Sequence, residues 1–103
     1  MTSYPNTITV EVDCEIESIV PEFLENRKKD CLLINNLLDI DSFSDILTLG
    51  HRMKGAGGSY GFDEISTIGE TIERAALAAD KETIRSAVAQ LADYLERIAV
   101  VYV

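Results

Sequence analysis

Cysteine, proline and tryptophan are scarce or missing in this chain of 103 residues, which has two cysteines, two prolines and no tryptophan. Cys14 and Cys31 are far apart, and no Cys-x-x-Cys pair occurs, so we expect neither a disulfide framework nor a metal site. Free thiols are typical of a reducing compartment, and we therefore expect the protein to be cytoplasmic.

Positive charge is the second shortage. There are 9 basic residues against 18 acidic ones, which gives a net charge of -9. Binding to nucleic acid or to an anionic membrane surface needs a cationic face, so we exclude both kinds of partner. No apolar run approaches the roughly 18 to 20 residues of a membrane span. The first residues, MTSYPNTITVEVD, do not have the basic and then apolar order of a secretory signal.

The beginning of the chain alternates in a way that is typical of a strand. In ITVEVD, Ile8, Val10 and Val12 alternate with polar residues, and we expect residues 1–14 to form an extended N-terminal arm. The last residues, VVYV, either pair with this arm or complete the helix before them, and the pattern allows both.

Helical periodicity replaces the alternation from about residue 15 onward. Pro21 suits the first turn of a helix that runs to about Leu38. A second helix follows, with either Ser42 or Asp41 as its N-cap. Gly61 is placed where a left-handed residue would end that helix.

Two further amphipathic segments complete the predicted fold. A third helix begins near Asp63, and Asp80 caps a fourth whose apolar stripe extends to Ile98. The short connections force neighbouring helices to run antiparallel. We therefore predict an all-α, up-down-up-down four-helix bundle that forms a single domain over residues 15–103, behind the N-terminal arm.

The only histidine, His51, lies on the flank of the predicted second helix. Successive helical residues are about 100° apart, so His51 lies to one side of Gly50, at the middle of the buried face. Gly55 and Gly58 fall on the same flank, and each costs the helix about 1 kcal/mol relative to alanine. Gly57 points inward, where close helix packing would explain it. We infer that Gly55 and Gly58 leave an open patch through which another surface can approach His51.

Lys54 lies one turn beyond His51 and can reach the imidazole ring. Its ammonium group would stabilise a phosphoryl group on that ring through charge-assisted hydrogen bonds. A nucleophile, a nearby positive charge and an open approach are the parts that phosphoryl transfer needs, because this chemistry depends mainly on positioning and charge neutralisation.

The pattern His51-x-x-Lys54-Gly55-x5-Gly61, with the small residue Gly58 inside it, resembles the signature of histidine-containing phosphotransfer (HPt) domains. The resemblance covers essentially the whole chain and implies a phosphorelay intermediate. His51 would take a phosphoryl group on Nε2 from the aspartate of a receiver domain, or from a histidine kinase, and pass it to another receiver. The receiver would supply Mg²⁺, and this chain would bind no cofactor of its own.

Further expectations concern activity, oligomeric state and the docking surface. The length leaves no room for an ATP-binding lobe and no P-loop is present, so we expect a phosphohistidine carrier and not a kinase. The alternative is a helical interaction module that docks on a receiver or kinase without carrying phosphate. We expect a monomer, although the ITVEVD arm could mediate a weak dimer. The expected docking residues lie before and after His51: Ser44, Leu47, Thr48, Ser59 and Phe62.

Overall fold

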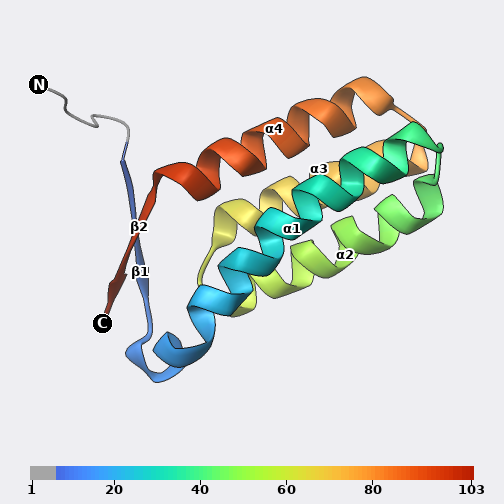
Figure 1. Cartoon of the computed structure of the whole chain (residues 1–103). Helices are drawn as coiled ribbons and strands as arrows, with labels where there is room; N and C mark the ends of the chain where they lie inside the picture. The colour runs from blue at the N-terminus through green and yellow to red at the C-terminus, as the bar shows by residue number, and fades with distance from the viewer. Residues whose placement is uncertain (1–6) are drawn as a thin grey trace, which may run out of the picture.

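The computed structural model describes residues 7–103, which form four helices with two short strands at one end (Figure 1). The elements, in chain order, are β1 (Ile8–Val12), the 3-10 helix η1 (Cys14–Ile19), α1 (Val20–Asp39), α2 (Phe43–Ser59), α3 (Asp63–Leu77), α4 (Lys81–Arg97) and β2 (Ile98–Tyr102). Each helix contacts the next one along the chain, and α1 also contacts α4, so the four helices close into a bundle. The predicted four-helix fold is confirmed.

The three turns between helices share one geometry, in which a left-handed residue follows the helix. Asp41, Gly61 and Ala79 have φ values of 55°, 87° and 52°. At the end of α2, the Phe62 N–H donates to the carbonyl oxygen of Gly57 at 2.8 Å, which satisfies one of the free helix-end carbonyls. Gly61 therefore ends α2 as the sequence predicts.

The predicted caps differ in what their side chains do. Asp80 accepts a hydrogen bond from the Thr83 N–H at 3.1 Å, which confirms it as the cap of α4. Ser42 occupies the N-cap position of α2, but its hydroxyl donates to the carboxylate of Asp45 at 2.7 Å instead of accepting from the helix backbone. The start of α2 therefore depends less on a side-chain cap than the sequence indicates.

The two strands answer the question that the sequence leaves open. β1 and β2 pair in parallel, with Ile8 opposite Ile98 and Val12 opposite Tyr102. The prediction that the fourth helix continues to Ile98 is wrong: α4 ends at Arg97, and Ile98 has an extended backbone with ψ 141°. Pairing with β1 satisfies backbone groups of this β-branched segment that a further helical turn would otherwise have satisfied.

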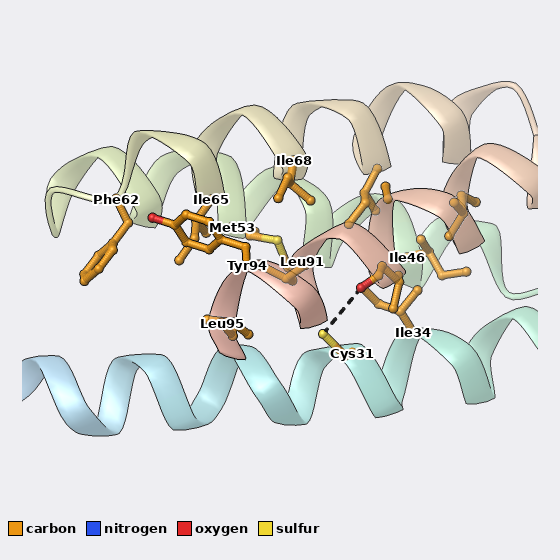
Figure 2. Packing of buried hydrophobic residues seen from close by; sticks show 14 of the residues in the cluster. Cys31, Ile34, Ile46, Met53, Phe62, Ile65, Ile68, Leu91, Tyr94 and Leu95 are labelled. Carbon is orange, nitrogen blue, oxygen red and sulfur yellow. Dashed lines mark hydrogen bonds between the residues drawn. The ribbon is translucent and has the colours of Figure 1, made fainter. Parts of the chain in front are cut away.

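The core lies between all four helices and is filled mainly by branched aliphatic side chains (Figure 2). Val12 of β1 is buried in it, and the other inward residues of both strands pack against it. The thiol of Cys31 on α1 donates a weak hydrogen bond to the Val88 carbonyl oxygen of α4 at 4.0 Å, drawn as a dashed line in Figure 2. Among residues 7–103, no helix is long and apolar enough to cross a membrane.

Candidate functional site

Three glycines bring the backbones of α2 and α3 into direct contact, and we call them the glycine seam: Gly50, Gly57 and Gly69. A Cβ added at Gly50 would lie 2.7 Å from the Glu73 nitrogen, and one at Gly69 would lie 2.5 Å from the Lys54 nitrogen. A Cβ at Gly57 would lie 2.5 Å from the Ser66 nitrogen. Backbone atoms cannot move aside as a flexible side chain can, so only glycine fits at these positions. The sequence-based explanation of Gly57 by close packing is confirmed.

This close approach places Glu73 of α3 beside His51 of α2. The His51 side chain is 69% exposed, and its Nδ1 lies 2.9 Å from Oε2 of Glu73. An ionised carboxylate can only accept hydrogen bonds, so Nδ1 carries the proton and donates it. In the neutral ring the lone pair is then on Nε2, the nitrogen that points away from Glu73. Glu73 thus fixes both the tautomer and the orientation of the imidazole.

Lys54 reaches the same carboxylate from one turn further along α2. Its Nζ lies 3.8 Å from Oε1 of Glu73, while the other carboxylate oxygen holds His51. The Lys54 side chain is 47% exposed and that of Glu73 is 19% exposed. An ion pair that is this long and this open to water contributes little to stability. Lys54 is therefore held near the ring without being fixed to the carboxylate.

The two glycines expected to form the open patch differ from each other. Apart from its chain neighbours and the backbone of its own helix, a Cβ added at Gly55 would meet no atom of the described residues within 4 Å, so the space there is open. At Gly58 a Cβ would lie 3.4 Å from Oγ of Ser66, and the Gly58 N–H already donates to that oxygen at 2.7 Å. Gly55 thus leaves open space next to the site, whereas Gly58 is in contact with α3.

The five expected docking residues are not all at the surface. Ser44, Thr48 and Ser59 are exposed, and Leu47 is half-buried and packs against the core. Phe62 is 0% exposed, so expecting it to contact a partner is wrong. The left-handed turn at Gly61 redirects the chain, and the Phe62 ring packs inward, with its centroid 5.8 Å from that of Phe23.

Sequence reasoning missed the contribution of α3 to the site. Ser66, Gly69 and Glu73 are three and four residues apart, which places them on one stripe of that helix. A glycine and a glutamate among the apolar residues of a helix face were the only available signal. Within residues 7–103 no group of three or more histidine, cysteine, aspartate or glutamate side chains could hold a metal ion.

The family comparison agrees with this geometry. The family model described as Hpt domain matches residues 18–100, a range that includes all four helices in full. No curated protein and no solved structure matches the chain. Hpt domains are phosphocarrier modules, not kinases, and work with histidine kinases and receiver domains in two-component systems. Because the match covers most of the chain, this protein belongs to the Hpt domain family, with a phosphotransfer role in two-component signalling.

Proposed function

We propose that His51 is the phosphoacceptor and that it exchanges its phosphoryl group with the aspartate of a receiver domain, or receives it from a histidine kinase. The observation that carries this proposal is the pair formed by His51 and Glu73. The ring is 69% exposed, yet its Nδ1 is held 2.9 Å from a carboxylate oxygen. An exposed histidine with no role in packing does not need such an orienting partner, whereas a nucleophile does.

The chemistry follows from the tautomer. The Nε2 lone pair attacks the phosphorus of the aspartyl phosphate, the bond between phosphorus and the aspartate oxygen breaks, and the aspartate leaves as a carboxylate. No proton has to leave Nε2, because the ring proton is already on Nδ1. The phosphorylated ring is positively charged, and the carboxylate of Glu73 stabilises that charge across the 2.9 Å hydrogen bond. In the reverse step the receiver carboxylate attacks phosphorus and the bond to Nε2 breaks.

Lys54 stabilises the phosphoryl group once it is attached to His51. The long contact of 3.8 Å between its ammonium and Glu73 is easily exchanged for a contact with phosphoryl oxygens. The protein then keeps a positive charge beside the new negative charge without moving its backbone. Such preorganised charges contribute most when the docked partner excludes water from the site.

The approach of the partner is consistent with the surface around His51. Gly55 leaves open space, and the exposed side chains of Ser44, Thr48 and Ser59 are small. We expect the receiver to dock on this side of α2 and to bring the Mg²⁺ that its own aspartate needs. A cytoplasmic, monomeric carrier, as expected from the sequence, is part of the same proposal.

The test is transfer of label from a phosphorylated receiver domain to this protein, followed as acid-labile and base-stable phosphate. We expect the wild type to become labelled and His51→Gln to remain unlabelled. Glu73→Gln is expected to lower the transfer rate by roughly 10- to 100-fold, because the ring loses the partner that orients it. Glu70→Gln is the matched control, since Glu70 is one turn away on α3 and pairs with Arg74 at 2.8 Å.

Two outcomes would contradict the proposal. Equal labelling of the wild type and His51→Gln would place the phosphoryl group elsewhere. A wild type that binds the phosphorylated receiver without taking up label would instead identify an interaction module that carries no phosphate.

A further inference from the structure

The hydroxyl of Ser66 bridges two groups of the helix that carries the site. Its Oγ donates to the carbonyl oxygen of Lys54 at 2.5 Å and accepts from the N–H of Gly58 at 2.7 Å. In an uninterrupted α-helix these two groups bond directly to each other, because they are four residues apart. The Ser66 side chain of α3 therefore contacts both groups of one step of the α2 hydrogen-bond ladder, in the turn that begins with Lys54.

Space for this hydroxyl comes from the glycines that follow Lys54. A Cβ added at Gly57 would lie 2.9 Å from Oγ of Ser66, closer than real Cβ atoms come to such an atom. The Cβ position of Gly58 is 3.4 Å from the same oxygen. The Gly57–Gly58 pair, which lowers helix stability, thus leaves space for the Ser66 hydroxyl against α2.

Three residues of α3 surround Lys54 at three different points. The Ser66 hydroxyl donates a hydrogen bond to the Lys54 carbonyl oxygen. Gly69 leaves space for the Lys54 backbone nitrogen, because a Cβ on residue 69 would lie 2.5 Å from that nitrogen. Glu73 lies 3.8 Å from the Lys54 ammonium group. Both ends of the Lys54 backbone unit and the tip of its side chain are therefore placed by the same stripe of α3.

We propose that Ser66 is a positioning residue for phosphoryl transfer, whose bridging hydroxyl ties the Lys54–Gly58 turn to α3 and thereby directs the Lys54 ammonium toward the phosphoryl group on His51. This inference rests on the proposed function. Without the hydroxyl, the Lys54–Gly58 turn loses both of its hydrogen bonds to α3. The root of the Lys54 side chain then shifts relative to His51 and Glu73, and small displacements of a charged group are costly in this chemistry.

The experiment measures transfer from a phosphorylated receiver at increasing receiver concentrations. Ser66→Ala is expected to lower the maximal rate about fivefold to tenfold and to leave the half-saturating receiver concentration unchanged. Thr67→Ala is the matched control: its hydroxyl is exposed and bonds only to the Asp63 carbonyl within α3 at 3.2 Å. The control is expected to behave as the wild type. If Ser66→Ala does not fold, Ser66→Cys replaces it, because it keeps the shape and weakens both hydrogen bonds.

A double-substitution cycle separates positioning from a merely structural role. In the Lys54→Ala background, Ser66→Ala is expected to have no further effect on the maximal rate, because the group that it positions is gone. If Ser66→Ala matches the wild type, or slows transfer equally with and without the Lys54 side chain, the role proposed for Ser66 is wrong while His51 remains the phosphoacceptor. If the wild type takes up no label, the proposed function fails and the role of Ser66 fails with it.

Discussion

Two of the helix contacts of this bundle are built in opposite ways. α2 and α3 meet backbone to backbone along the glycine seam, where an added Cβ would come as close as 2.5 Å to a main-chain atom. α1 and α4 meet through buried side chains instead, among them Cys31, Ile34 and Leu91 (Figure 2). The first contact has almost no freedom to adjust, whereas side chains can repack when one of them changes.

His51, Lys54 and Glu73, the charged and nucleophilic groups of the proposed site, lie along the contact between α2 and α3. The carboxylate of Glu73 must come within hydrogen-bonding distance of a ring on the neighbouring helix, and it does so at 2.9 Å. Glutamate spans that gap because α2 and α3 are held so close together. The glycines that weaken both helices therefore fix the geometry of the site.

The largest expected loss of stability is on the side-chain contact. Leu91 is 0% exposed, and Leu91→Ala leaves a cavity that should lower the free energy of unfolding by about 2 to 5 kcal/mol. At temperatures where the variant remains folded, we expect its phosphoryl transfer rate to match that of the wild type. Urea unfolding and the transfer assay together check this. A large fall in transfer by the folded variant would show that the two contacts are not independent.

A substitution in the glycine seam should instead affect phosphoryl transfer as well as stability. Gly69→Ala places a Cβ 2.5 Å from the Lys54 nitrogen and 2.8 Å from the Gly50 carbonyl oxygen, so the helices must separate. We expect a loss of about 1 to 3 kcal/mol in the free energy of unfolding. Unlike Leu91→Ala, the folded variant should also transfer phosphoryl groups more slowly, since the distance from Glu73 to His51 increases. Unchanged transfer would mean that the site does not depend on the seam.

The sequence predicts α2 and its residues well, because the necessary information is local. The positions of His51, Lys54 and Gly55 follow from one helical period, and Gly61 ends that period in a conformation that suits glycine. Phe62 comes after the turn, where helical geometry no longer determines which way a side chain points. Its burial could not be derived from the pattern within α2.

Contacts between distant segments could not be predicted from the sequence, for a physical reason. Glu73 is 22 residues from His51 in the sequence. Whether Glu73 faces the ring depends on how α2 and α3 are aligned, and the glycine seam sets that alignment only once the two helices pack together. The pairing of β1 with β2 likewise joins two segments that are far apart in the sequence. Period alone could not distinguish a strand from one more helical turn at Ile98.

Gly55 belongs to α2 but not to the glycine seam. Its substitution should change stability less than Gly69→Ala does, and in the opposite direction. Apart from its chain neighbours and the backbone of its own helix, no atom of the described residues lies within 4 Å of its Cβ position, so Gly55→Ala should raise the free energy of unfolding by up to about 1 kcal/mol. The added methyl group occupies the open patch, and we expect transfer from the receiver to become slower. Thermal unfolding and the transfer assay would show this combination; a destabilised variant would mean that the space is not open.

The smallest expected effect concerns pH and belongs to the contact between α1 and α4. Burial, aided by the negative charge of Asp30, raises the pKa of the Cys31 thiol. A group whose pKa is raised in the folded state contributes stability below its unfolded pKa and loses it as the pH rises toward the folded pKa. The free energy of unfolding should therefore fall above about pH 8.5, with a slope from this thiol of at most about 1.4 kcal/mol per pH unit.

Cys31→Ala isolates the contribution of this thiol, because the variant keeps every other titrating group. Burial also raises the pKa of Tyr94, so the wild type and the variant share that later alkaline loss of stability. Chemical unfolding between pH 7 and pH 10, in a Cys14→Ala background that removes the exposed thiol, should give a shallower decline for Cys31→Ala. Parallel curves would show that Cys31 ionises as easily in the folded protein as in the unfolded chain. The side-chain contact would then be open to water, and its difference from the seam would be smaller than the structure indicates.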